Sequence, residues 1–173
     1  MKLILSVELV TRLGQELKRA GSREIGGVLV GEHVEDESFR IVDLSVQRSG
    51  GSQAHFIRDV EHNRAFLDAF FAKTGKDYQR FNYLGEWHSH PLFTPLPSRE
   101  DAATMRDLVE DPAVGVNFAI MMIVSLGWRS TLKMSATAYR VNEAPVAAEV
   151  VLEGYPQAGQ VGWLKAIIDY FRS

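Results

Sequence analysis

The spacing of apolar residues changes repeatedly along this chain between the patterns of strands and of helices, and this alternation limits its fold most. Short apolar runs predict strands, whereas apolar residues three and four positions apart predict amphipathic helices. Because neighbouring strands can also form hairpins, we expect a mixed α/β (α+β) fold rather than a regular βαβ repeat. The predicted strands are residues 2–5, 25–31, 40–46, 81–90, 117–125, 130–140 and 146–153. The predicted helices are residues 7–20, 60–74 and 99–110, with a further amphipathic helix on Trp163, Ile167, Ile168 and Phe171.

The helix ends carry their own sequence signals. Ser6 and Asp59 are typical N-caps, and Gly21 and Gly75 are typical stops. The apolar residues of the second helix predict its inner face, which consists of Val60, Phe66, Leu67, Phe70 and Phe71.

Composition limits the function classes. A chain of 173 residues suits one domain, which we expect to span residues 1–173. The net charge of −3 argues against a nucleic-acid partner, because phosphate contacts need a basic surface. The apolar N-terminal run is too short for a signal peptide, and no window approaches a membrane span. We therefore expect a cytoplasmic protein with no membrane partner. The chain has no cysteine, so any metal must be held by His, Asp or Glu.

One stretch carries potential metal chemistry. His88 and His90 are two residues apart in a predicted strand, so their side chains point to the same face and can converge on one ion. Asp101 follows after ten further residues. A catalytic zinc site needs three such ligands and leaves the fourth position to water.

Asp101 also fits a purely structural role. Ser98 is typical of an N-cap, and a carboxylate at the third helical position completes a capping box. The two roles are compatible, since the first turn of a helix presents a ligand rigidly. Ser98 either only caps the helix or also faces the reacting carbonyl.

Two acidic residues lie close to these elements. Glu86 shares the parity of the two histidines, and a peripheral charge is the favoured interpretation over a group that supports the site. Glu24 directly precedes the predicted strand 25–31, where a solvated glutamate at a strand edge is the default interpretation. Trp87 has the opposite parity and is expected in the core.

The other histidines have no partner at ligand spacing. We expect His33, His55 and His62 at the surface, with His55 the best candidate for an exception because its loop could border a cleft.

The whole constellation resembles the JAB/MPN metalloprotease family, also called JAMM. The family pattern is a glutamate on an early strand, then His-x-His, ten residues and an aspartate. Residues 24–31, 84–91 and 97–101 match it, and the similarity in element order covers about residues 1–140. The resemblance implies a curved, mixed, mainly antiparallel sheet flanked by helices.

Carried over by position, the resemblance implies that His88, His90 and Asp101 bind one zinc ion per chain. Glu24 would be the general base and Ser98 would stabilise the oxyanion. This chemistry is coherent, because zinc acidifies its bound water and a positioned carboxylate takes the proton.

The resemblance also implies a substrate class, which is a bond after the C-terminus of a ubiquitin-like protein or of a conjugated protein. Gly85-Glu86-Trp87 departs from the Gly-Trp form of many members and is similar to bacterial members encoded with ubiquitin-activation-like enzymes. Some of these act in anti-phage operons of the CBASS type on a conjugated cGAS-like nucleotidyltransferase. The implied partners are therefore that nucleotidyltransferase and an activating or conjugating enzyme. Processing of a sulfur-carrier or ubiquitin-like precursor and a non-catalytic MPN scaffold are the alternatives.

Overall fold

The computed structural model describes residues 1–48 and 58–154. Within this part of the chain, three helices and a mixed seven-stranded sheet confirm the expected α+β class. The strands are β1 (Lys2–Leu5), β2 (Gly26–Glu35), β3 (Ser38–Leu44), β4 (Phe81–Ser89), β5 (Phe118–Leu126), β6 (Leu132–Arg140) and β7 (Val146–Leu152). The helices are α1 (Val7–Ala20), α2 (Val60–Lys73) and α3 (Arg99–Glu110), and a 3₁₀ turn, η1 (Trp128–Ser130), joins β5 to β6.

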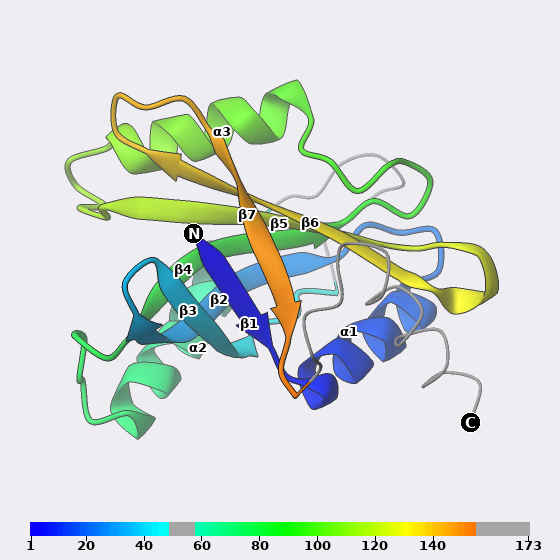
Figure 1. Ribbon diagram of the computed structural model, residues 1–173, viewed down its shortest axis with the longest axis horizontal. Coiled ribbons are helices and arrows are strands. Elements are labelled where there is room, and N and C mark those ends of the chain that lie inside the picture. Colours follow the sequence, from blue (N-terminus) through cyan, green and yellow to red (C-terminus); the bar gives the residue numbers. More distant parts are fainter. Residues whose placement is uncertain (49–57, 155–173) are drawn as a thin grey trace.

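The sheet is curved and closes on itself. Its strand order is β1-β3-β2-β4-β5-β6-β7, and β7 pairs with β1 to complete the ring (Figure 1). The β1–β3, β1–β7 and β4–β5 pairs are parallel, while the other four pairs are antiparallel. β4 therefore lies between an antiparallel neighbour, β2, and a parallel one, β5.

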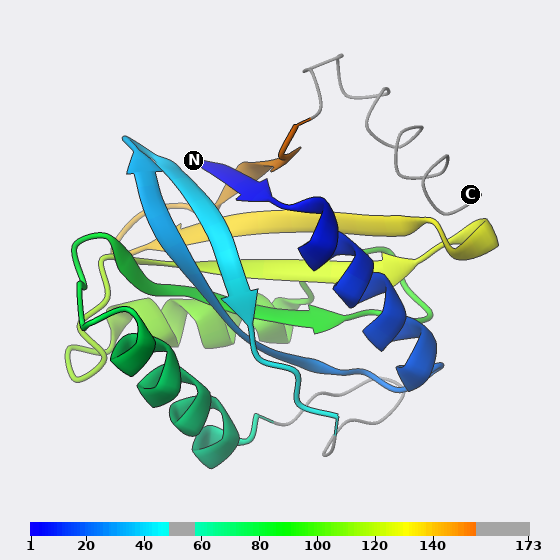
Figure 2. The ribbon, with the colours of Figure 1, turned by 90° about the horizontal axis from the view of Figure 1, so that it is seen from below.

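Two apolar clusters lie on opposite faces of the sheet, with α1 on one side and α3 on the other (Figure 2). The larger cluster joins Leu9, Leu13 and Leu17 of α1 to buried residues of the strands, among them Trp87. In the smaller one, Met105 of α3 packs with residues of β5 and β6. Trp87 is fully buried, as its parity predicts.

A bulge in β4 determines which of its side chains face α3. The β2–β4 register shifts between Leu29 and Val30, and Gly85 lies opposite Leu29 with a φ of 145°. A Cβ at Gly85 would lie 2.1 Å from the carbonyl oxygen of Ile120, so only glycine fits there. The extra residue lets Leu84 and Trp87 both enter the larger core, and the even-numbered positions that follow Gly85 face α3.

The expected helix caps are present in α1 and α2. The Ser6 side chain accepts a hydrogen bond from the Leu9 backbone N–H, and the Asp59 side chain accepts one from that of His62. Gly21 and Gly75 follow their helices with positive φ.

The expected inner face of α2 is partly wrong. Val60 is 73% exposed, and the buried residues of the helix are Asn63 and Phe70. Asn63 is tolerated there because its Oδ1 accepts a hydrogen bond of 2.8 Å from the Ser45 hydroxyl. Apolar periodicity cannot anticipate a buried position that is occupied by a satisfied amide.

None of the helices in residues 1–48 and 58–154 is long and apolar enough to cross a membrane. His33 and His62 are exposed, as expected. His55 and the expected helix on Trp163 to Phe171 lie outside the described residues.

Candidate metal centre

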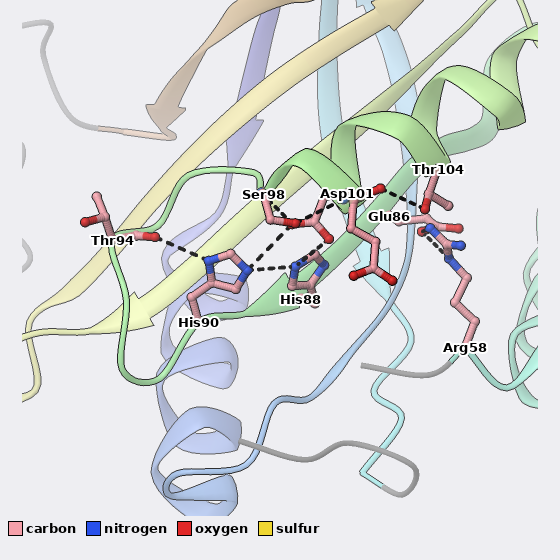
Figure 3. A network of polar contacts seen from close by, with 9 residues as sticks. Arg58, Glu86, His88, His90, Thr94, Ser98, Asp101 and Thr104 are labelled. Atoms are coloured by element: carbon pink, nitrogen blue, oxygen red, sulfur yellow. Dashed lines mark hydrogen bonds and ion pairs between the residues drawn. The ribbon is translucent and has the colours of Figure 1, made fainter. Parts of the chain in front are cut away.

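β4 and α3 bring His88, His90 and Asp101 together (Figure 3). The Nε2 atoms of His88 and His90 are 3.0 Å apart, and the Asp101 carboxylate oxygens lie 3.4 Å from the first and 3.8 Å from the second. Both histidines are buried, and the Asp101 side chain is 19% exposed. Three ligand-type atoms therefore converge on a small volume with one partly open side.

These distances fit a zinc ion. Zinc bonds of about 2.0–2.2 Å in tetrahedral geometry place neighbouring ligand atoms about 3.3–3.6 Å apart. The His88 Nε2–His90 Nε2 and His88 Nε2–Asp101 Oδ1 separations, 3.0 and 3.4 Å, lie near or in this range, and His90 Nε2 is 3.8 Å from the other carboxylate oxygen, Oδ2. Two imidazole nitrogens and one carboxylate oxygen are also a donor set that catalytic zinc uses.

The first turn of α3 holds Asp101 in place. The Ser98 N–H donates to Asp101 Oδ2 at 2.7 Å, and the Asp101 N–H donates to Ser98 Oγ at 3.1 Å. This reciprocal pair is a complete capping box. The other carboxylate oxygen, Oδ1, is the one nearest His88. The capping and ligand roles of Asp101 are therefore compatible in one geometry.

His90 is oriented by a backbone carbonyl that the sequence did not single out. Its Nδ1 lies 3.3 Å from the carbonyl oxygen of Thr94, to which a protonated Nδ1 donates. This contact leaves Nε2 as the unprotonated nitrogen that faces His88 and Asp101. The loop after Pro91 therefore selects the tautomer that can bind a metal.

The Asp101 carboxyl is strongly acidic. Burial works against its ionisation, but the hydrogen bond and charge of His88 and the hydrogen bonds from Ser98 outweigh it and hold the Asp101 pKa well below its usual value. Asp101 is thus present as the carboxylate that a metal requires.

Glu24 is buried at the start of the β2–β4 pair rather than at a solvated edge. β2 pairs with β4 so that Gly26 is opposite His88, and Ile25 and Ser89 exchange hydrogen bonds through Ser89 N–H and Ser89 Oγ. Glu24 directly precedes Ile25, so its backbone lies close to the end of β4 that carries His88 and His90. Glu24 is only 6% exposed, so the default interpretation as a solvated residue is wrong.

Glu86 is also not the peripheral charge that the sequence favoured. It is 9% exposed, its Oε2 accepts a hydrogen bond of 2.6 Å from Arg58 Nε, and Arg58 Nη2 forms an ion pair of 2.6 Å with the same oxygen. Burial raises the pKa of Glu86, and the charge and hydrogen bonds of Arg58 act against this rise. Sequence offered no signal for Arg58, because it lies 28 residues from Glu86 and outside the helices and strands.

Comparisons with known proteins agree with this constellation. A sequence model of the family described as prokaryotic homologues of the JAB domain matches residues 6–139. A CD-NTase/cGAS isopeptidase from Enterobacter hormaechei is 29% identical over 153 residues, which are 87% of this chain and 82% of the relative. A CD-NTase/cGAS isopeptidase from Vibrio cholerae is 33% identical over 95 residues, which are 53% of this chain and 58% of the relative.

The solution structure of a protein from Desulfitobacterium hafniense has the same fold. It superimposes with a TM-score of 0.64 at 19% identity and covers 90% of this chain and 95% of that one. All the candidate site residues, from Glu24 to Asp101, lie inside the span that the family model matches.

Proposed function

Since the chain belongs to the family of prokaryotic homologues of the JAB domain, we propose that it is a zinc-dependent isopeptidase that reverses a ubiquitin-like conjugation. The convergence of His88, His90 and Asp101 carries this proposal. The three would bind one zinc ion through two Nε2 atoms and a carboxylate oxygen. When bound, zinc acidifies a coordinated water and polarises the carbonyl of the scissile bond.

Glu24 is the proposed general base. Its side chain is buried, and it directly precedes Ile25, which exchanges hydrogen bonds with Ser89, the residue between the two histidines. It would accept a proton from the attacking water while the water oxygen bonds to the carbonyl carbon. When the carbon–nitrogen bond breaks, Glu24 would return this proton to the leaving amine. Glu24 thus ends in its original protonation state, and the products are a carboxylic acid and an amine.

Ser98 is the proposed oxyanion partner. Its Oγ accepts a hydrogen bond from the Asp101 N–H, and the hydroxyl hydrogen is not used by that bond. Ser98 is exposed at the start of α3, beside the metal ligand Asp101. The hydroxyl would therefore donate to the carbonyl oxygen as negative charge develops on it.

The names of the relatives support a particular substrate. We propose that the chain cleaves the bond that joins the C-terminus of a CD-NTase, a cGAS-like nucleotidyltransferase, to its conjugation partner. An activating and conjugating enzyme would make this bond, and the pathway would belong to cytoplasmic anti-phage defence of the CBASS type.

The direct test is cleavage of a CD-NTase conjugate. The chelated protein should be inactive, and addition of one equivalent of Zn²⁺ should restore release of the free CD-NTase on a gel. A matched pair of substrates, one lysine-linked and one linear, would separate deconjugation from precursor processing. Absence of cleavage of both substrates by the zinc-loaded protein would contradict the proposed function.

A further inference from the structure

The ion pair of Arg58 and Glu86 lies on the same face of β4 as the metal cluster. Glu86 precedes His88 by two residues, which is about 7 Å along a strand. Figure 3 shows the pair on one side of His88 and His90 on the other. The face of β4 that α3 overhangs thus presents, in order, a guanidinium held by Glu86, the imidazole of His88 and that of His90.

Glu86 fixes the Arg58 guanidinium in place but engages only some of its N–H donors. Arg58 Nε donates a hydrogen bond of 2.6 Å to Glu86 Oε2, and Nη2 forms an ion pair of 2.6 Å with the same oxygen. A guanidinium has five N–H donors. Within residues 1–48 and 58–154, the Arg58 side chain makes no hydrogen bond or ion pair other than those with Glu86. The Arg58 side chain is 34% exposed, whereas the Glu86 carboxylate is nearly buried. Donors therefore remain available at a fixed position beside the metal cluster.

An isolated structural role explains this arrangement poorly. The Glu86 side chain is only 11% exposed, and taking a carboxylate out of water is costly unless it is paired. An apolar side chain at position 86 would avoid that cost. Glu86 does, however, fix the plane of a guanidinium, and a planar fork of donors is suited to binding carbonyl or carboxylate oxygens.

The spacing matches an extended peptide. Along an extended chain, carbonyl groups that point to the same side repeat every two residues, about 7 Å. Only the acyl side of an isopeptide bond offers such a repeat, because the leaving side is an amine. With the scissile carbonyl at the metal cluster and the tail running along β4 towards Glu86, the carbonyl two residues upstream would lie beside Glu86 and its partner Arg58.

We propose that Arg58, positioned by Glu86, is a substrate-binding residue that donates to the main-chain carbonyl two residues before the scissile bond. The inference rests on the proposed isopeptidase function. It assigns the pair to recognition of an extended C-terminal tail and gives Arg58 no part in binding the metal.

The test measures binding separately from hydrolysis. The probe is a fluorescein-labelled peptide of the last ten residues of the CD-NTase, and the protein is zinc-loaded Glu24→Gln. Adding Arg58→Gln should weaken binding about tenfold or more, the range for a charge-assisted hydrogen bond, and should raise KM in the Glu24 protein with kcat nearly unchanged. Arg58→Lys, which keeps the charge without the fork, should have an intermediate effect. Arg12→Gln is the matched control. Arg12 belongs to α1, the helix that packs on the other face of the sheet, and it also forms an ion pair, with Asp43 of β3.

An altered peptide distinguishes binding from a merely structural role. Replacing the amide that contains the upstream carbonyl by an ester weakens that acceptor. The ester should bind the Arg58 protein more weakly than the amide does, and this difference should disappear in Arg58→Gln. Three results would overturn the inference. The amide and ester peptides could differ in affinity by the same amount in both proteins, the peptide could bind equally with and without Arg58, or Arg58→Gln could lose its bound zinc. If the peptide fails to bind even the Arg58 protein and no conjugate is cleaved, the proposed function itself is wrong.

Discussion

The two ends of the β2–β4 pair hold acidic residues in different ways. At one end, Glu32 lies opposite Phe81 and accepts hydrogen bonds of 2.6 Å from both Arg40 and Arg80. At the other end, Asp101 faces the imidazole nitrogens of His88 and His90, which also face one another. Permanent cations compensate the first cluster, whereas the second gathers ligand atoms around a space that suits a divalent ion. A cluster that fixed guanidinium groups neutralise stabilises the fold, and a cluster of converging imidazole and carboxylate ligands is suited to bind a metal.

Removal of a metal ligand should have the largest effect. We expect Asp101→Ala to bind far less than the one zinc per chain of the original protein and to lose conjugate cleavage, because two histidines alone hold zinc weakly. Elemental analysis of the purified proteins measures the zinc content. Asp107→Ala on the same helix is the control and should keep both zinc and activity. Full zinc content in Asp101→Ala would contradict the proposed ligand set.

Replacement of the proposed base should affect turnover and spare the metal. Glu24→Gln keeps the shape of the side chain but cannot accept a proton, so kcat should fall by about 10²–10⁴-fold. The zinc content should stay at about one per chain. Glu110→Gln, an exposed glutamate at the far end of α3, is the control and should match the original protein. Unchanged turnover in Glu24→Gln would remove the base assignment.

Gly85 lies in β4 between Phe81, which is opposite Glu32, and His88 of the metal cluster. Its replacement tests whether the bulge is needed for stability. Alanine there would adopt a strained φ of 145° with its Cβ against the Ile120 carbonyl. We expect Gly85→Ala to lower the free energy of unfolding by about 3 kcal/mol, measured by urea denaturation. Gly154→Ala tests strain without the clash, because a Cβ at that positive-φ position meets no atom within 4 Å. Equal stability of the two variants would show that the contact with Ile120 contributes nothing.

Replacement of Glu32, at the end of the β2–β4 pair that holds the ion pairs, should have the smallest effect on stability. This effect should depend on pH. Hydrogen bonds from Arg80 and Arg40 lower the pKa of Glu32. A lowered pKa in the folded state means stability that is present above the unfolded pKa of about 4.3 and is lost as the pH falls through the folded pKa. Glu32→Gln should therefore cost about 1 kcal/mol at pH 7, a value kept small by the exposure of Arg80. This difference from the original protein should shrink when urea denaturation is repeated near pH 3. A constant difference would show that the charge of Glu32 is not the cause.

Local signals explain why much of the fold was predictable. Caps at Ser6 and Asp59 and the apolar periods placed the helices and most strands within a few residues of their observed bounds. The strand parity of His88 and His90 and the cap at Ser98 depend on neighbours in sequence, so they could be read directly. The burial of α2 was less predictable, since Asn63 is buried only because Ser45 of a distant segment satisfies its amide.

The sequence by itself determined the types of ligand, their shared face and the rigid start of the helix that carries Asp101. Only the tertiary structure buried Glu24 near the end of the β2–β4 pair, paired Arg58 with Glu86 and directed His90 through the Thr94 carbonyl. The first set depends on residues close in the chain, whose geometry follows from the strand and helix repeats. The second set depends on sheet register and on a loop conformation, which packing of the whole fold decides.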